Sequence, residues 1–160
     1  MAEQYYLGNP LLKKANTPIE FTQEQIVEFV KCKDDPVYFA NNYVKIVTLD
    51  HGLQTFKPYH FQEKLIRNFH TNRFNICKMP RQTGKSTTVV SFLLHYAVFN
   101  DNVNIGILAN KAATARELLD RLQTAYENLP KWMQQGIISW NKGSLELENG
   151  SKILAASTSA

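Results

Sequence analysis

The chain has 160 residues, of which 44% are hydrophobic and 20% charged, with a formal net charge of +4 and a pI near 9.0. This composition excludes fibrous and disordered proteins and fits one soluble domain that can bury a core without metal or disulfide support. The apolar runs are short, and residues 1–10 lack the basic-then-apolar order of a signal peptide, so the sequence predicts a cytoplasmic protein without a membrane span.

Residues 1–57 are predicted to form a helical lead-in. Its first 19 residues show no sustained apolar period, so they are either mobile or docked on a partner. Thr22 and Gln25 then form a capping-box pattern that predicts a helix to about Lys33, and Asp34-Asp35-Pro36 interrupts it. A second short helix and a strand-like run at 46–53, with a turn at His51-Gly52, complete this part.

Residues 58–160 are predicted to be a nucleotide-binding core that begins with a third helix, with Pro58 in its first turn. The segment from Arg73 to Thr88 reads R-F-N-I-C-K-M-P-R-Q-T-G-K-S-T-T. It predicts a strand at Phe74–Met79, a loop, and a helix that is apolar on nearly every face. From Met79 to Ser86 the sequence fits the phosphate-loop pattern G-x-x-x-x-G-K-[ST], except that Met79 replaces the first glycine.

The residues of this loop suit a nucleoside triphosphate. Gly84 lets backbone N–H groups approach phosphate oxygens, Lys85 can reach the β- and γ-phosphates, and the Ser86 hydroxyl suits Mg²⁺. A Gly-Lys-Ser match also arises by chance in polar turns, but the order of strand, loop and buried helix favours the nucleotide interpretation. Residues 57–85 hold seven basic residues against Glu63 alone, an excess that favours triphosphate, DNA backbone or both.

Downstream of the loop helix the pattern continues to alternate between strand and helix. A second buried strand is predicted at 103–109, and a helix at 111–129 is capped by Asn110 and ended by Pro130. A short strand at 137–140 and a half-exposed hairpin follow, the hairpin closed by a two-residue turn at Asn149-Gly150. No apolar run followed by Asp-Glu, the usual acidic Mg²⁺ ligand of such ATPases, occurs in the chain.

The cysteines and histidines predict no further chemistry. Cys32 and Cys77 form no C-x-x-C pair and are expected to be reduced, with Cys77 buried in the strand before the loop. The four histidines lack metal-ligand spacing. The only predicted metal is Mg²⁺ bound through the nucleotide and Ser86.

These residues resemble the large terminase subunit of tailed bacteriophages, in particular the myovirus type, and the likeness covers nearly the whole chain. In that family the first glycine of the loop is often lost, as at Met79 here. The matching segments are Asp35–Phe39, Pro58–Gln62, Arg81–Ser86, Ala109–Ala112 with Arg116–Leu119, Tyr126–Trp132 and Gly150–Ala160.

The resemblance implies roles for single residues. Gln62 matches a glutamine that recognises adenine, and a helix-surface glutamine is the alternative. Arg81 matches a loop arginine that acts on the γ-phosphate, and a surface arginine without kinetic effect is equally open. With Lys85, Arg81 is the predicted catalytic pair. The nucleotide-binding residues are predicted to be Gln62, Arg81, Gln82, Thr83, Gly84, Lys85, Ser86 and Thr87, with ATP and Mg²⁺ as cofactors.

The resemblance also implies a fold and a setting. We expect a three-layer α/β fold of the P-loop type (ASCE/RecA-like) with a parallel sheet, incomplete at its C-terminal side, in the cytoplasm of an infected bacterial host. The expected partners are double-stranded viral DNA, the portal protein, the small terminase subunit and further copies in a ring.

The acidic Asp-Glu strand and the nuclease domain of the family are absent from these 160 residues. The chain alone is therefore expected to lack turnover, and Phe74–Met79 is expected to expose unpaired backbone and apolar surface. An ATP-dependent helicase and a catalytically inactive nucleotide-binding fragment are the alternatives.

Overall fold

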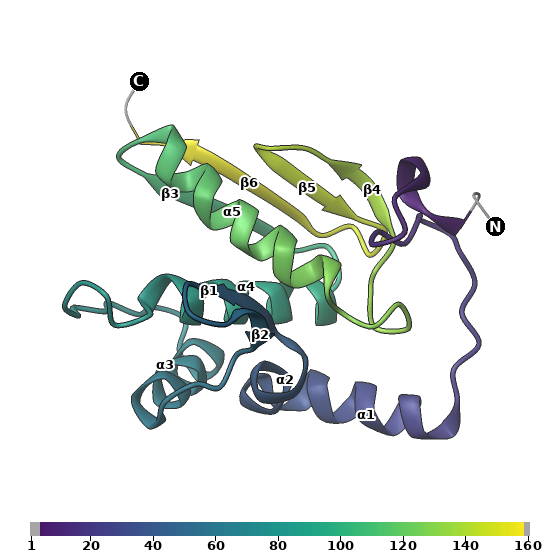
Figure 1. Cartoon of the computed structure of the whole chain (residues 1–160), viewed down its shortest axis with the longest axis horizontal. Coiled ribbons are helices and arrows are strands. Elements are labelled where there is room, and N and C mark those ends of the chain that lie inside the picture. The colour runs from purple at the N-terminus through teal and green to yellow at the C-terminus, as the bar shows by residue number, and fades with distance from the viewer. Residues whose placement is uncertain (1–3, 159–160) are drawn as a thin grey trace.

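The computed structural model describes residues 4–158, which fold as a mixed α/β protein (Figure 1). Helices and strands are interspersed along the chain, mostly in consecutive pairs. Their order is a 3₁₀ turn at Tyr6–Gly8, α1 (Gln23–Asp34), α2 (Pro36–Tyr43), β1 (Lys45–Thr48), β2 (Gly52–Thr55), α3 (His60–Thr71), α4 (Lys85–Phe99), β3 (Asn104–Ala109), α5 (Ala112–Glu127), β4 (Ile137–Trp140), β5 (Ser144–Leu147) and β6 (Lys152–Ser157).

The helices begin where local chemistry predicts. Thr22 and Gln25 form the expected capping box of α1, and the Asp35 carboxylate accepts from the N–H groups of Val37 and Tyr38 to start α2. Two caps differ from the prediction. Pro58 lies one residue before the Tyr59 cap of α3, and α5 starts after Lys111 without the Asn110 side-chain cap.

The main sheet has the strand order β3-β6-β5-β4, with α5 against one face. The predicted parallel sheet is confirmed only in part: the sheet is mixed, because β3 and β6 pair in parallel while β5 pairs antiparallel with both β6 and β4. Tight hairpins join β4, β5 and β6, and a short connection can join only antiparallel neighbours. Exposed Leu108 and Leu154 mark the opposite face, so the third layer of the expected fold is not formed by residues 4–158.

Two details of the sheet also differ from the prediction. Strand β3 is exposed at alternate positions and is therefore buried on one face only. The β5–β6 connection has four residues, Glu148 to Ser151, with Gly150 at a φ of 81° and the Leu147 N–H bonded to the Ser151 carbonyl. Gly150 alone takes the left-handed conformation, as in a type I turn followed by a glycine bulge.

The segment between α3 and α4 is the largest departure from the predicted fold. Phe74–Met79 belongs to no strand, Phe74 and Ile76 are 82% and 100% exposed, and Cys77 is exposed and not buried. A strand needs a hydrogen-bonded neighbour, and no strand within residues 4–158 pairs with this segment. The apolar pattern is present, but the pairing that would turn it into a strand is not.

Residues 12–16 of the lead-in are docked on the protein's own sheet. Leu12 is buried, Lys14 forms a parallel bridge with Ile137, and the Lys13 ammonium bonds the Glu148 carboxylate at 3.1 Å. Burial raises the pKa of Glu148, but hydrogen bonds from the N–H groups of Asn16 and Gly136 and from Lys13 outweigh it and hold that pKa below its usual value. This segment therefore belongs to the folded core.

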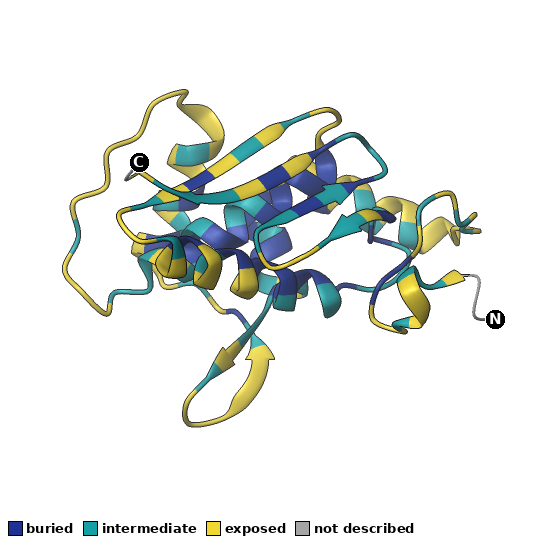
Figure 2. Ribbon diagram, turned by 90° about the horizontal axis from the view of Figure 1, so that it is seen from above, coloured by how far each residue is buried: buried dark blue, intermediate teal, exposed yellow. Residues whose placement is uncertain are grey.

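The core extends from the packed helices α1 to α4, across α5, to the inner face of the main sheet, and Figure 2 shows these buried residues in dark blue. His95 of α4 is 2% exposed, and its Nε2 lies 2.8 Å from the Cys32 carbonyl of α1. Burial lowers the pKa of His95 to about 4. None of the helices within residues 4–158 has the length and apolar character needed to span a bilayer.

Candidate nucleotide-binding site

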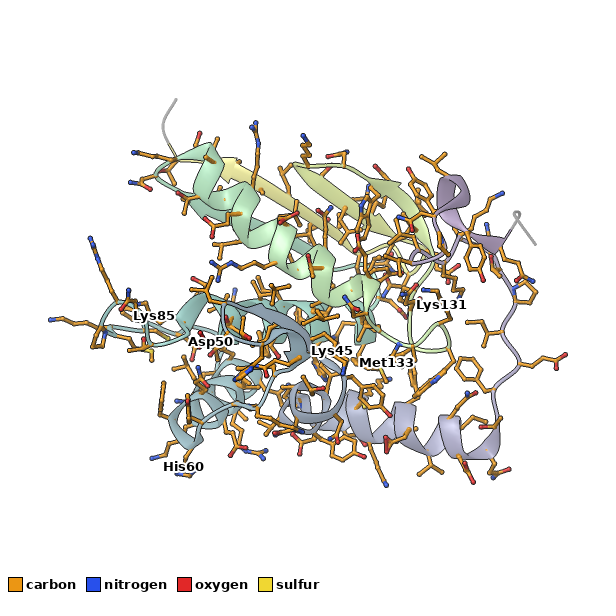
Figure 3. All side chains as sticks on the ribbon, viewed as in Figure 1. Lys45, Asp50, His60, Lys85, Lys131 and Met133 are labelled. Atoms are coloured by element: carbon orange, nitrogen blue, oxygen red, sulfur yellow. The ribbon has the colours of Figure 1, made fainter. Side chains whose placement is uncertain are left out.

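The predicted phosphate loop ends at the N-terminus of α4, where Figure 3 labels Lys85. Gly84 is the N-cap and has a left-handed backbone with φ 73° and ψ 21°. The next three residues, Lys85 to Thr87, occupy the first turn, in which N–H groups have no intrahelical acceptor. A row of free N–H donors at the positive end of a helix is suited to an anion.

The Lys85 side chain folds back across the loop. Its ammonium donates to the carbonyl oxygens of Met79 and Pro80, at 2.7 and 2.6 Å. Met79 is outside the set of positive-φ residues, so the loop in this conformation does not need glycine there. Gln82 does have a positive φ, 61°, a conformation that costs a non-glycine residue about 1–2 kcal/mol.

Arg81, Gln82 and Ser86 are exposed on this loop, whereas Thr83 is half-buried and donates from its hydroxyl to the Pro80 carbonyl at 3.0 Å. Within residues 4–158, Arg81 takes part in none of the ion pairs. The guanidinium therefore stands free beside the N-terminus of α4.

Gln62 connects the start of α3 to the loop. It is 4% exposed, its Oε1 accepts from the Tyr59 N–H at 2.9 Å, and its Nε2 donates to the Thr83 carbonyl at 3.3 Å. The positive φ of Gly84 favours glycine, and a Cβ there would also displace the Gln62 amide from the loop. Gln62 holds the loop in place, and its amide is largely occupied by that task.

A cleft of about 740 Å³ opens beside these residues. Its walls are the β1–β2 hairpin, the start of α3 and the loop. The lining residues are Ile46, Thr48, Gln54, Thr55, Phe56, Lys57, Tyr59, Phe61, Gln62, Gln82, Thr83, Gly84 and Thr87. The cleft has the size and the mixture of apolar and polar groups typical of small-molecule sites.

The structure thus brings Gln62, Gln82, Thr83, Gly84 and Thr87 to one cleft, while Lys85 points onto the loop carbonyls. Sequence reasoning missed the hairpin wall. The turn at His51-Gly52 was predicted, but the return strand Gly52–Thr55 has only four residues, and nothing local indicates that it faces the loop.

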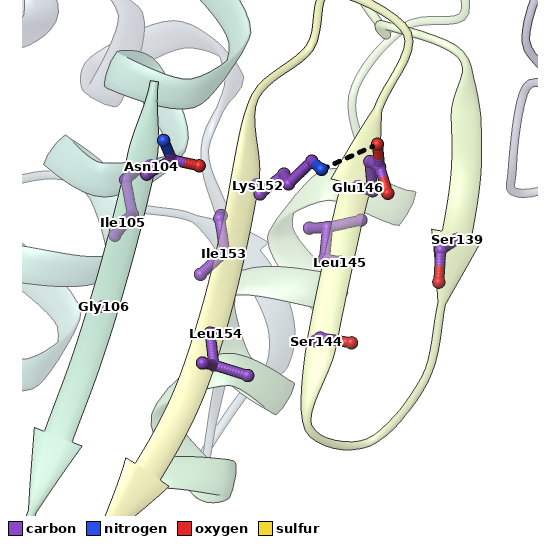
Figure 4. A pocket seen from close by; sticks show the side chains of 10 residues that line it. All are labelled: Asn104, Ile105, Gly106, Ser139, Ser144, Leu145, Glu146, Lys152, Ile153 and Leu154. Atoms are coloured by element: carbon purple, nitrogen blue, oxygen red, sulfur yellow. Dashed lines mark ion pairs between the residues drawn. The ribbon is translucent and has the colours of Figure 1, made fainter. Parts of the chain in front are cut away.

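A second cleft, of about 450 Å³, lies on the open face of the main sheet, with the Lys152–Glu146 ion pair at 3.5 Å in its wall (Figure 4). It shares no residue with the loop site. Among residues 4–158 no three His, Cys, Asp or Glu side chains are grouped as metal ligands.

The sequence model of one protein family, described as "Terminase large subunit, T4likevirus-type, N-terminal", matches residues 76–160. The match covers more than half of the chain and includes the loop, α4 and the whole four-stranded sheet. The chain belongs to this family. Large terminase subunits of this type are components of bacteriophage DNA-packaging motors and are generally ATPases. Gln62 and the β1–β2 hairpin of this terminase chain precede the matched region.

Proposed function

We propose that this chain binds ATP with Mg²⁺ at the loop and forms the ATP-binding part of a viral DNA-packaging motor. The main support is the loop geometry: a left-handed Gly84 caps α4, the first-turn N–H groups of α4 are free, and Lys85 reaches across the loop. These groups are donors that suit phosphate oxygens, and their proximity supports the proposal.

The proposal gives each residue a role. Lys85 and the N–H groups of residues 82–87 bind phosphate oxygens, and Ser86 supplies a hydroxyl ligand to Mg²⁺. Arg81 binds the γ-phosphate, and Gln62 contributes to recognition of the base while holding the loop. Bound Mg²⁺ would neutralise phosphate charge. The exposed Ser86 and the free Arg81 fit such ligands, since neither group has to leave an ion pair.

In the complete motor, we propose, ATP hydrolysis drives translocation of double-stranded DNA into the procapsid in the host cytoplasm. The subunits would form a ring in contact with the portal protein and the small terminase subunit. Family membership favours packaging over a helicase function. The basic excess at residues 57–85 is consistent with an anionic ligand.

A nucleotide-binding chain without turnover is the second candidate for the 160 residues alone. No acidic cluster is found among residues 4–158, and a P-loop ATPase needs carboxylates to hold Mg²⁺ and orient water.

Titration of the 160-residue chain with a fluorescent ATP analogue and Mg²⁺ tests the proposal. Lys85→Ala should weaken binding by at least about tenfold, because it removes a charge-assisted phosphate contact. A phosphate-release assay with DNA present then separates binding from turnover, and negligible release is expected. Equal affinity of the wild type and Lys85→Ala would refute the loop assignment.

A further inference from the structure

The β1–β2 hairpin turns one face toward the loop. Ile46 pairs with Gln54 in register, and both line the 740 Å³ cleft together with Thr48. Side chains alternate across a strand, so Lys45 and Val47 lie on the other face, where they line a cleft of about 530 Å³ against α5 that Ile46, at the edge of the wall, also lines. The hairpin is thus a wall whose loop-facing side carries the polar pair Thr48 and Gln54.

The hairpin is fixed at its root and free at its tip. Val44 and Phe56, which flank it, are buried, and the Phe56 N–H bonds the Val44 carbonyl at 2.8 Å. Val47 and Leu49, nearer the tip, are exposed. Gln54 lies two residues from the buried Phe56, so its backbone is on the anchored part of the hairpin.

The orientation of the Gln54 amide follows from Thr48. The Thr48 hydroxyl donates to the Gly52 carbonyl at 3.2 Å and accepts from the His51 N–H at 3.3 Å. Its one proton is therefore used, and it can only accept from Gln54, whose Nε2 lies 3.3 Å away. This arrangement points the Gln54 nitrogen at Thr48 and leaves the Gln54 Oε1 free in the cleft as an acceptor.

Gln62, on the opposite side of the cleft, is placed differently. It is buried, its Oε1 already accepts from Tyr59, and its Nε2 already donates to Thr83. The two glutamines therefore differ in what they can offer a ligand: Gln54 is exposed and has its oxygen free.

We propose that Gln54 is a specificity-determining residue that accepts a hydrogen bond from the exocyclic amino group of adenine. The proposal rests on nucleotide binding at the loop. A glutamine amide matches the amino and ring-nitrogen groups of adenine, whereas guanine presents its O6 acceptor at the same position. Because Thr48 holds the amide in one orientation, O6 would face the Gln54 oxygen, and GTP is disfavoured.

The test is displacement of N-methylanthraniloyl-ATP from the 160-residue chain by unlabelled ATP or GTP. Gln54→Ala should reduce the ATP preference over GTP by about threefold to tenfold, mainly by weakening ATP binding. Thr48→Val should shift the preference in the same direction, because the freed amide can turn its N–H toward guanine. Leu53→Ala, a substitution of an exposed residue on the other face of the hairpin, is the matched control and should leave the ratio unchanged.

A second variant separates recognition from a change in the fold. Gln54→Glu keeps an acceptor, so it should preserve the ATP preference within about twofold while weakening ATP and GTP alike through repulsion of the phosphates. Gln62→Ala should lower the affinity for both ATP and GTP, since the loop loses its support. Any loss of the preference for ATP over GTP in this variant comes in addition to that effect. Circular dichroism checks that each variant is folded.

The outcomes distinguish the two proposals. If the wild type binds, Lys85→Ala weakens binding and Gln54→Ala leaves the ATP-to-GTP ratio unchanged, Gln54 has no role in specificity, while nucleotide binding stands. If the wild type does not bind the probe, or Lys85→Ala has no effect, the loop assignment fails and the Gln54 proposal fails with it.

Discussion

Two regions of this chain differ in how many of their polar groups have hydrogen-bond partners. At the N-terminal corner, defined by Lys13, Gln134, Gly136 and Glu148, nearly every donor and acceptor has a partner. The Gln134 oxygen accepts from the Lys13 N–H, and its nitrogen donates to the carbonyls of Leu11, Tyr126 and Leu129. At the predicted phosphate loop, residues 80–86, the Arg81 side chain is exposed and outside the ion pairs of residues 4–158, and the first-turn N–H groups of α4 have no intrahelical acceptor.

The difference indicates which region maintains the fold and which is kept for a ligand. In a buried network every polar group depends on its partner. Removing one member destabilises the fold, because the remaining groups have neither a protein partner nor water to bond. Free donors at a helix N-terminus contribute little to stability but are ready to bind an anion. If this comparison is correct, substitutions at the corner should change the free energy of unfolding, and substitutions at the loop should change binding and turnover.

The largest effect on stability is expected from Glu148→Ala. The change leaves the Lys13 ammonium with a single carbonyl partner and removes the acceptor of two backbone N–H groups. The pair is only partly buried, so leaving its hydrogen-bond donors without this acceptor should cost about 2–3 kcal/mol, which should appear as a lower midpoint in urea unfolding.

Glu146→Ala is the matched control, since Glu146 pairs with exposed Lys152 on the open sheet face. Removing that pair should cost less than about 1 kcal/mol. Similar losses for the two variants would show that the corner is no more important to stability than a surface ion pair.

Acidification should produce the next largest effect, through His95 in the helical core. Burial lowers the pKa of His95 to about 4, against 6.5 in an unfolded chain, so the unfolded state binds the proton more readily. Stability is therefore full above pH 6.5 and falls as the pH drops toward 4, by about 2 kcal/mol between pH 7 and pH 5.

Urea unfolding at these two pH values measures the effect, with His95→Gln as the comparison. Gln can still donate to the Cys32 carbonyl but does not titrate in this range. A pH dependence that persists unchanged in His95→Gln would assign the acid sensitivity to another group.

The comparison also explains what the sequence could predict. The Thr22–Gln25 capping box depends on residues three positions apart, so a local pattern is sufficient to predict it. The Lys13–Glu148 contact joins residues 135 positions apart, and no local signal marks it. The loop was found because its motif is local, whereas the hairpin wall with Gln54 depends on tertiary packing.

The strand predicted at Phe74–Met79 failed for the same reason. Its apolar pattern is local, but a strand is completed only by a neighbour, and pairing is a property of the whole sheet. Buried Cys77 was inferred from that strand and was wrong with it.

The smallest effect on stability is expected from Arg81→Ala, and this variant tests the loop side of the comparison most directly. Arg81 is exposed and outside the ion pairs of residues 4–158, so the free energy of unfolding should change by less than about 0.5 kcal/mol. In the complete motor, however, ATP turnover should fall by at least about tenfold, because a planar guanidinium matches charge that spreads over the phosphoryl oxygens during transfer.

Arg81→Lys keeps the charge but not the planar, two-pronged guanidinium, and it should recover nucleotide affinity more fully than turnover. Steady-state phosphate release and equilibrium ATP binding, measured on the same variants, separate the two effects. If Arg81→Ala leaves turnover intact, Arg81 is a surface cation that neutralises bound phosphate, and the free groups of the loop serve binding alone.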